Sequence, residues 1–275
     1  MRQNPFLVKK RKSVVQPLLI VLLSLLVLST GCPLADGGNP LFMAVGDNGQ
    51  AWCSADGGVS WTDSSPGGVS LYGIAYGNGR FVAVGSSGQA WWSADGGASW
   101  TDSSPGGQSL NGVAYGNGHF VAVGMNGQAW WSEDGGENWT DSSPGLMSQI
   151  GGITYGGGRF VAVGEAGRAY WSVDGTGWNE STPGGGNDLR SIAHGNERFV
   201  AVGGNGQAWW SADGSVGSWT DSSPGGTNLW RIAYGDGRFV AVGQNGQVWW
   251  SPDNGQSWVD SSPGGNVLRD IVFRP

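Results

Sequence analysis

The chain has 275 residues, of which 53 are glycine and 17 are tryptophan, and only 13% of the residues are charged. Disordered chains are poor in aromatic residues and long helices tolerate few glycines, so this composition excludes both and favours short strands joined by tight turns. Residues 33–275 carry nine arginines and 21 acidic side chains. Their net charge of −12 gives the protein no electrostatic reason to bind nucleic acid or an anionic lipid surface.

The first 31 residues have the layout of an export signal. A basic segment, Lys9–Lys12, precedes an apolar run at 18–28, and small residues lead to Cys32. This ending resembles the bacterial lipoprotein signal, although Ser29 stands where that family usually has a leucine, valine or isoleucine. The resemblance implies cleavage after residue 31, lipidation of Cys32, a short linker over 32–40, and anchoring to a bacterial outer membrane or cell surface.

An uncleaved membrane anchor is the alternative, because the uncharged stretch 13–30 is marginally long enough to span a bilayer. In either case the rest of the chain would lie outside the cytoplasm. Cys53 is the only other cysteine, and with Cys32 lipidated it has no partner for an intramolecular disulfide. We therefore expect Cys53 to be a small core residue.

Residues 41–275 consist of six repeats of about 39 residues. In the third repeat, four short strands are expected at 110–115, 119–123, 128–132 and 138–141, which we call strands a, b, c and d, with glycine-rich turns between them. A period near 40 with strand-like content is typical of propeller blades. The sequence predicts an all-β, six-bladed β-propeller of four-stranded antiparallel blades. The repeats are marked by Phe42, Phe81, Phe120, Phe160, Phe199 and Phe239.

Two features of the repeats predict how the blades pack. Strand c carries adjacent tryptophans, such as Trp91 and Trp92, and neighbours in a strand point to opposite faces. Both faces of a sheet are then apolar, which suits a blade between two others. The first repeat begins at strand b, whereas the last segment, 267–273, matches strand a. We expect this segment to complete the first blade and close the ring.

Between strands c and d lies a turn of the form Ser-x-Asp-x-Gly-x-Ser/Thr-Trp. It is complete at 54–61, 93–100 and 251–258 and varied at 132–139, 172–178 and 211–219. This turn resembles the Asp-box, also called the bacterial neuraminidase repeat. The resemblance implies a structural aspartate that accepts backbone N–H groups across its own turn and no metal-binding or catalytic role. The aspartates concerned are Asp56, Asp95, Asp134, Asp174, Asp213 and Asp253.

Asp-box propellers include sialidases, some glucan hydrolases, sortilin-type receptors and photosystem II stability/assembly factor-like proteins. The compact repeats are most similar to the last group and its bacterial relatives. The similarity to sialidases ends at the boxes, because the exported part has no arginine before Arg80 to serve an arginine triad. The two histidines, His119 and His194, occupy positions that other repeats fill with arginine and tyrosine. We expect no metal, no cofactor and no catalytic residue.

Positions that differ between the six copies indicate a candidate binding site. They gather in the b–c turns and at the start of strand a. Because the b–c and d–a connections of an up-and-down blade share one end, these residues are expected around the mouth of the central channel, on the face opposite the Asp-boxes. The candidates are Tyr72, Asn111, Arg190, Trp230, Arg231, Arg269 and Asp270.

Three functions remain open at this point. The first is a monomeric, lipid-anchored, non-enzymatic module for protein binding or assembly, in which arginine and tryptophan are typical contact anchors. The second is a lectin or a sialidase-like glycoside hydrolase, which needs two carboxylates near its substrate. The third is a structural surface protein without a specific ligand, in which the variable residues are drift. For the second function, the carboxylates expected at the mouth of the channel are Asp47, Glu165, Asp188 and Asp270.

Overall fold

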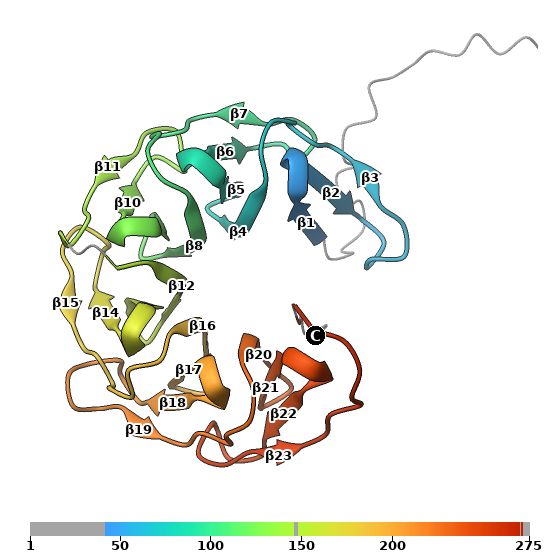
Figure 1. Ribbon diagram of the computed structural model, residues 1–275. Helices are drawn as coiled ribbons and strands as arrows, with labels where there is room; N and C mark the ends of the chain where they lie inside the picture. The colour runs from blue at the N-terminus through green and yellow to red at the C-terminus, as the bar shows by residue number, and fades with distance from the viewer. Residues whose placement is uncertain (1–41, 146–147, 270, 272–275) are drawn as a thin grey trace, which may run out of the picture.

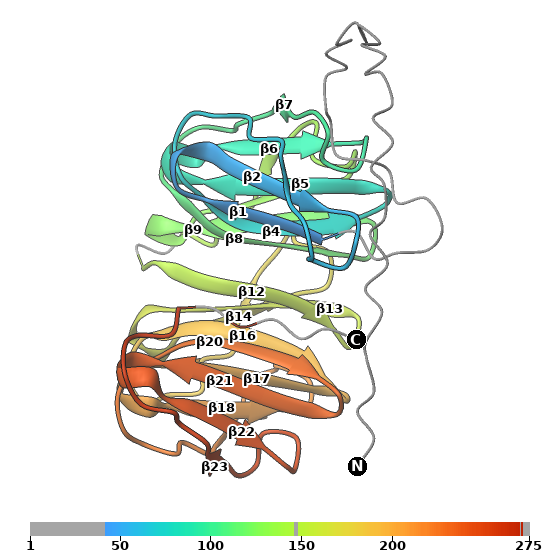
Figure 2. The same ribbon diagram turned by 90° about the vertical axis from the view of Figure 1, so that its right-hand side faces the viewer.

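The computed structural model describes residues 42–145, 148–269 and 271, which form a ring of six antiparallel sheets (Figure 1). Five sheets have four strands, and the first, β1–β3, has three. Seen from the side, the first and last sheets lie as separate layers (Figure 2). The six-bladed all-β propeller is therefore confirmed. Within the described residues, no helix is long and apolar enough to cross a membrane.

The strands follow the a, b, c, d order of each repeat from the channel outward. Strands a are β4 (Leu71–Gly77), β8 (Leu110–Gly116), β12 (Ile150–Gly156), β16 (Leu189–Gly195) and β20 (Leu229–Gly235). Strands b are β1 (Phe42–Gly46), β5 (Arg80–Gly85), β9 (His119–Gly124), β13 (Arg159–Gly164), β17 (Arg198–Gly203) and β21 (Arg238–Gly243). Strands c are β2 (Gln50–Ser54), β6 (Ala90–Ser93), β10 (Ala129–Ser132), β14 (Ala169–Ser172), β18 (Ala208–Ser211) and β22 (Val248–Ser251).

Strands d, at the rim, have only two residues each: β3 (Thr62–Asp63), β7 (Thr101–Asp102), β11 (Thr140–Asp141), β15 (Asn179–Glu180), β19 (Thr220–Asp221) and β23 (Val259–Asp260). They are shorter than predicted because the preceding tryptophan, Trp139 in the third blade, packs into the interface between blades. Such short edge strands limit pairing with other chains. The b–c connections are 3-10 turns: η1 (Asp47–Gly49), η2 (Ser86–Gly88), η3 (Met125–Gly127), η4 (Glu165–Gly167), η5 (Gly204–Gly206) and η6 (Gln244–Gly246).

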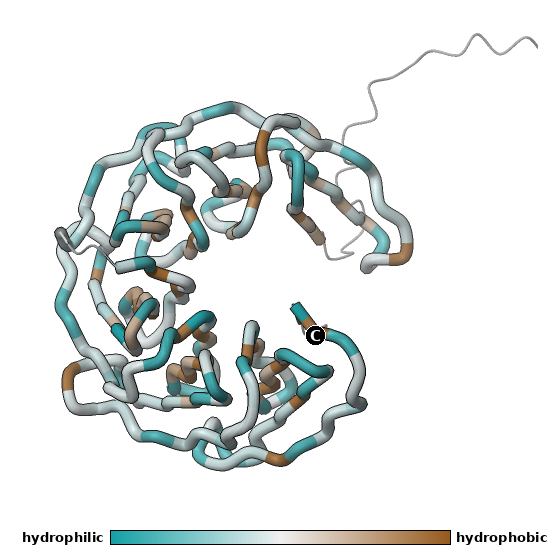
Figure 3. The backbone as a smooth tube through the Cα atoms, viewed as in Figure 1, coloured by the Kyte–Doolittle hydropathy of each residue, from teal (hydrophilic) through white to brown (hydrophobic). Residues whose placement is uncertain are grey.

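The hydrophobic core lies between neighbouring blades. Val82 and Val84 of the second blade pack with Leu110 of the third, and all three are buried. Trp92 of the second blade and Trp130 of the third lie partly buried against the same cluster. Trp131, which is next to Trp130 on β10, packs against the next cluster, which includes Val121 and Phe160. The two tryptophans of a strand c therefore pack on opposite faces of their sheet, as the sequence predicted. Hydrophobic segments accordingly recur on the strands inside the blades (Figure 3).

Neighbouring innermost strands approach each other so closely that one position in four of the five described strands a requires glycine. A Cβ atom on Gly116 would lie 2.0 Å from Cγ of Tyr155 in the next blade. The Tyr155 ring also packs against Phe160, with the ring centroids 4.9 Å apart, so it has little room to move. The same contact joins Gly77 to Tyr115. Each aromatic ring thus rests on the glycine of the preceding blade.

The first blade has no innermost strand among the described residues. Tyr76, which would face that strand, is 61% exposed, whereas its counterparts Tyr115 and Tyr155 are partly buried. The segment after β23 runs inward from the rim (Figure 1), and the Leu268 N–H donates to the Gly243 carbonyl at 2.9 Å. Residues 267–269 and 271 form no strand, and the rest of the expected closing strand lies outside the described residues. Ring closure stays a prediction.

The aspartates of the c–d turns accept hydrogen bonds within their own turns. The Asp134 carboxylate accepts from the Ser132 hydroxyl at 2.8 Å and from the N–H groups of Glu137 and Asn138, both at 3.0 Å. Burial raises the pKa of Asp134, but hydrogen bonds from Asn138, Ser132 and Glu137 outweigh it and hold the pKa below its ordinary value. The pKa is lowered at all six positions: Asp56, Asp95, Asp134, Asp174, Asp213 and Asp253.

These turns are expected to make the propeller sensitive to acid. A carboxyl group whose pKa is lower in the folded state stabilises the fold above its unfolded pKa, about 3.9, and this contribution is lost as the pH falls through the folded pKa. Asp134→Asn should therefore destabilise the protein by about 1 kcal/mol at pH 7, because hydrogen bonds to a charged group are worth about 1.5–3 kcal/mol and solvent screens this largely exposed carboxylate. In thermal unfolding, the difference from wild type should shrink as the pH falls below about 3.9 toward the lowered pKa of the folded state. Glu133→Gln, next to it in the same turn, is the control, and parallel pH profiles for wild type and Asp134→Asn would contradict the assignment.

Cys53 lies on β2 and is 1% exposed, so its burial in the core is confirmed. The expectation that it takes no part in a disulfide is wrong, because its sulfur is disulfide-bonded. That expectation assumed that Cys32, which lies outside the described residues, carries a lipid.

Candidate functional site

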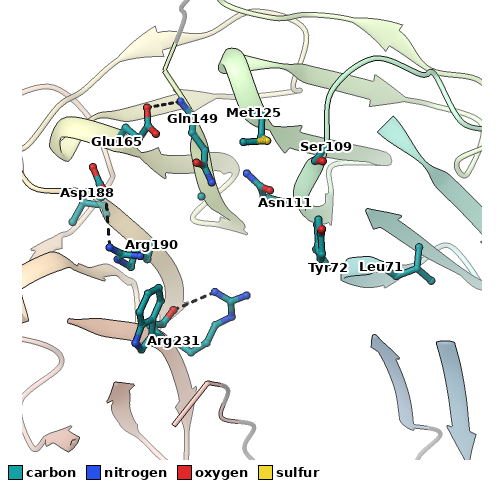
Figure 4. A pocket seen from close by; sticks show the side chains of 13 residues that line it. Leu71, Tyr72, Ser109, Asn111, Met125, Gln149, Glu165, Asp188, Arg190 and Arg231 are labelled. Carbon is teal, nitrogen blue, oxygen red and sulfur yellow. Dashed lines mark hydrogen bonds and ion pairs between the residues drawn. The ribbon is translucent and has the colours of Figure 1, made fainter. Parts of the chain in front are cut away.

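A cavity of about 540 Å³ opens at the centre of the ring, on the face formed by the 3-10 turns and the first residues of strands a (Figure 4). Five of the seven predicted residues line it: Tyr72, Asn111, Arg190, Trp230 and Arg231. Arg269 is exposed and outside this lining, and Asp270 lies outside the described residues. The other lining residues are Leu71, Ser109, Met125, Gln149, Gly151, Glu165, Asp188 and Leu189. Their role in binding stays a prediction.

Each described strand a has a β-bulge at its second residue. Leu110 pairs with Gly124 and Gly112 pairs with Val123, so Asn111 between them has no partner on β9. A bulge bends the strand and redirects the side chain of the extra residue. The bulge therefore explains why these positions converge on the channel mouth. The bulged residues of the other strands are Tyr72, Gly151, Arg190 and Trp230.

Arg190 and Trp230 form a stack between the fifth and sixth blades. The guanidinium carbon of Arg190 lies 4.1 Å from the Trp230 ring centroid, within the range of a cation–π interaction. Arg190 Nη2 also lies 3.9 Å from Asp188 Oδ2, which is partly exposed. The guanidinium is thus held between an aromatic face and a carboxylate at the cavity wall.

Arg231 follows the bulge and occupies a position that is small in the other described strands a. The corresponding residues are Gly73, Gly112, Gly152 and Ser191. Its Nη1 donates to the Trp230 carbonyl at 3.1 Å. Arg231 lines the main cavity and also a smaller one of about 150 Å³ that includes residues deeper in the strands. Among the described repeats, it is the one charged side chain at this position.

The two carboxylates that line the cavity accept hydrogen bonds from backbone N–H groups nearby. Glu165 Oε2 accepts the Gln149 N–H at 3.1 Å, and Asp188 Oδ1 accepts the Ala166 N–H at 3.2 Å. Asp47, a third candidate for an acid, accepts the Ser70 hydroxyl at 3.0 Å and does not belong to the cavity lining. The described acids of this face therefore hold neighbouring turns in place, and among the described residues Glu165 and Asp188 are the two acids that line the cavity.

The opposite wall of the cavity is uncharged. Figure 4 shows Leu71, Tyr72 and Ser109 across from Arg190 and Arg231. Tyr72 is 45% exposed, and its hydroxyl accepts from the Ser86 hydroxyl at 2.6 Å. The cavity therefore has a charged side on the fourth to sixth blades and an uncharged side on the second and third.

Sequence reasoning missed one constraint on the variable b–c turns. Their second residue has a left-handed backbone, with φ between 54° and 58°. Asparagine tolerates this conformation well, which explains its recurrence. The first residue of the turn, such as Met125 or Glu165, is the one that varies at the cavity. The left-handed residues are Asn48, Ser87, Asn126, Ala166, Asn205 and Asn245.

The histidines lie within the scaffold. His194 packs against Phe199 with centroids 4.6 Å apart, and burial lowers its pKa. His119 packs edge-on against Trp131 at 5.4 Å. In the part of the chain that the structure describes, no group of three or more histidine, cysteine or acidic side chains could hold a metal ion.

Comparisons with known proteins bear on the fold. Neither a protein-family profile nor a curated protein matches the sequence. Two solved structures of YCF48 are similar to this chain. YCF48 bound to D1 peptide is 19% identical, with a TM-score of 0.66 and coverage of 84% of this chain and 81% of that one. YCF48 from Cyanidioschyzon merolae is 18% identical, with a TM-score of 0.67 and coverage of 84% and 85%.

The WD40 β-propeller domain of Doa1 is also similar, at 11% identity and a TM-score of 0.63, with coverage of 82% of this chain and 78% of that one. These identities are low, so the likeness concerns the propeller fold alone. Membership of the Asp-box family stays a prediction from the sequence.

Proposed function

We propose that this protein is a non-enzymatic module that captures a segment of a partner protein in the cavity at its channel mouth. One observation carries the proposal. The blades repeat nearly the same core, while their bulges direct different side chains, Tyr72, Asn111, Arg190 and Trp230, into one cavity. A site built from the variable positions of a repetitive scaffold is suited to recognise a specific ligand.

The cavity has the size and composition of a recognition site. Its volume of about 540 Å³ lies within the usual range for ligand pockets. Tryptophan and arginine, present here as Trp230, Arg190 and Arg231, are the residues most often found as binding hot spots. The propeller YCF48 has been observed with a D1 peptide, which supports a peptide segment as the ligand class.

Hydrolysis of a glycan is less well supported. A glycosidase needs two carboxyl groups directed at the bond that is cleaved. Here Glu165 and Asp188 each accept a backbone N–H of a neighbouring turn. We therefore propose that the cavity binds its ligand and does not hydrolyse it.

The test is partner capture from membranes with the full chain and two variants. Arg190→Ala/Trp230→Ala/Arg231→Ala removes the anchors of the cavity, and we expect at least a tenfold loss of partner, because a single hot-spot residue is worth about 2 kcal/mol or more. The control, Val59→Ala/Val173→Ala/Val216→Ala, changes exposed apolar residues in the c–d turns at the other end of the blades. Equal recovery with all three proteins, each with wild-type thermal unfolding, would contradict the proposal.

We further propose that the propeller is exported and held at a bacterial membrane by its N-terminal segment. The basic, apolar and small-residue layout of 1–31 supports export. Recovery of the intact chain from the cytoplasmic fraction would contradict export.

The sulfur of Cys32 distinguishes the two forms of membrane attachment. The chain has two cysteines, so a thioether lipid on Cys32 excludes an intramolecular disulfide through the same atom. Mass spectrometry of the purified protein separates these forms. A lipid mass on an N-terminal Cys32 identifies the lipoprotein that the signal predicts. A peptide that links Cys32 to Cys53 identifies an unlipidated sulfur and favours the uncleaved anchor.

A further inference from the structure

The geometry points to a ligand that joins a carboxylate to an apolar group, with the carboxylate at Arg190 and Arg231 and the apolar group at Tyr72 and Met125. This inference rests on the proposed function, because it names the chemistry of the segment that the cavity takes. It is carried by the unequal walls of the cavity (Figure 4).

The charged wall can bind an anion through two guanidinium groups. Arg190 lies on the fifth blade and Arg231 on the sixth, and both line the two cavities of the channel. The Trp230 stack and its carbonyl restrain both side chains, so less side-chain entropy is lost when a ligand binds. Guanidinium groups form strong, charge-assisted hydrogen bonds with carboxylates. This wall is therefore suited to a carboxylate.

The uncharged wall offers apolar area. Tyr72 and Met125 belong to neighbouring blades, line the cavity and are both exposed. Exposed aromatic and methionine side chains at a cavity are favoured contacts for apolar groups. A ligand that spans the cavity would meet the guanidinium groups of Arg190 and Arg231 at one end and this apolar surface at the other.

Asp188 sets the specificity of the charged wall. Its carboxylate lies 3.9 Å from Arg190 Nη2, where it competes with the carboxylate of a ligand for the same guanidinium. Removal of this negative charge should raise the affinity for an anion by roughly threefold to tenfold, as expected for like charges several ångströms apart that water screens strongly. The Asp188–Arg190 pair thus limits binding to ligands whose other contacts compensate for the competition between Asp188 and the ligand carboxylate.

The test uses three blocked peptides that differ in one residue. The probe is acetyl-Gly-Glu-Gly-Leu-Leu-amide, in which the glutamate side chain is the single charge, and the controls carry glutamine or lysine in its place. Calorimetry with the full chain should show that the glutamate peptide binds at least tenfold more tightly than either control. Its affinity should fall with added salt, because the interaction is between charges.

Two variants connect this preference to the named residues. Arg231→Gln should weaken binding of the glutamate peptide at least fivefold, and it should weaken binding of the uncharged glutamine peptide much less. Asp188→Asn should strengthen binding of the glutamate peptide. Equal affinities for the glutamate and glutamine peptides, or no change in either variant with wild-type thermal unfolding, would overturn the inference.

Hexanoate, a free acid with an apolar tail, separates two sources of the same chemistry. Tighter binding of the glutamate peptide assigns the site to a protein segment, and tighter binding of hexanoate assigns it to a small acid. Both results support a ligand that joins a carboxylate to an apolar group. Failure of all these probes, together with partner capture that depends on the triple variant, would overturn this inference and leave the proposed function standing.

Discussion

Replacement of Gly116 by alanine is expected to destabilise the propeller by about 3 kcal/mol, the upper part of the usual range for overpacking. The added Cβ would lie 2.0 Å from the Tyr155 ring, and that ring is held against Phe160. Neither the strand nor the ring can move without disturbing a buried interface between blades. For a domain of this size, the loss should lower the midpoint of thermal unfolding by roughly 6–12 °C.

A matched control is available at Gly177. An added Cβ there would meet no heavy atom within 4 Å, so Gly177→Ala should leave the midpoint almost unchanged. The double variant Gly116→Ala/Tyr155→Ala removes the clashing ring and should be more stable than the sum of the two single effects predicts. Additive effects would show that the Tyr155 ring is not the cause.

Deletion of residues 266–275 is expected to abolish the cooperative unfolding transition. The described part of the first blade lacks an innermost strand, and Tyr76 of the second blade is exposed beside it. The deleted segment contains Leu268, Ile271 and Phe273, and burial of such side chains stabilises a fold by about 1.5–3 kcal/mol each. Their combined loss, about 5 kcal/mol or more, is a large fraction of a typical domain stability.

Addition of the missing strand in trans provides the control for this deletion. A synthetic peptide of residues 266–275 should restore a cooperative transition to the truncated chain, whereas a peptide of the same composition in scrambled order should not. A truncated chain that unfolds like the intact protein would show that this segment does not close the ring.

The fold could be predicted because six copies of one sequence report on one structure. Adjacent tryptophans such as Trp91 and Trp92 require two apolar faces, and only a sheet between two other sheets provides them. The hydrogen bonds of Asp134 likewise depend on residues within its own turn. Features that are local and repeated can be predicted from the sequence because they do not depend on contacts between distant parts of the chain.

The arrangement of the cavity could be predicted only in part. Variation between repeats indicated Arg190 and Trp230, but their stack joins residues 40 positions apart on different blades. The bulge that directs these side chains to the cavity is one extra residue in a regular strand. Its signal in the sequence is the small residue that follows, such as Gly73 or Gly112. The disulfide of Cys53 was missed because the cysteines were interpreted through the signal sequence alone.

Amide hydrogen exchange of the complex with a captured partner tests the central claim most directly. If the partner occupies the channel mouth, exchange should slow at 71–73, 110–112, 189–191 and 229–231, where the bulges lie, and remain unchanged in the c–d turns at 54–61 and 93–100. Protection of those c–d turns, with the bulged segments exchanging as in the unbound protein, would contradict the account.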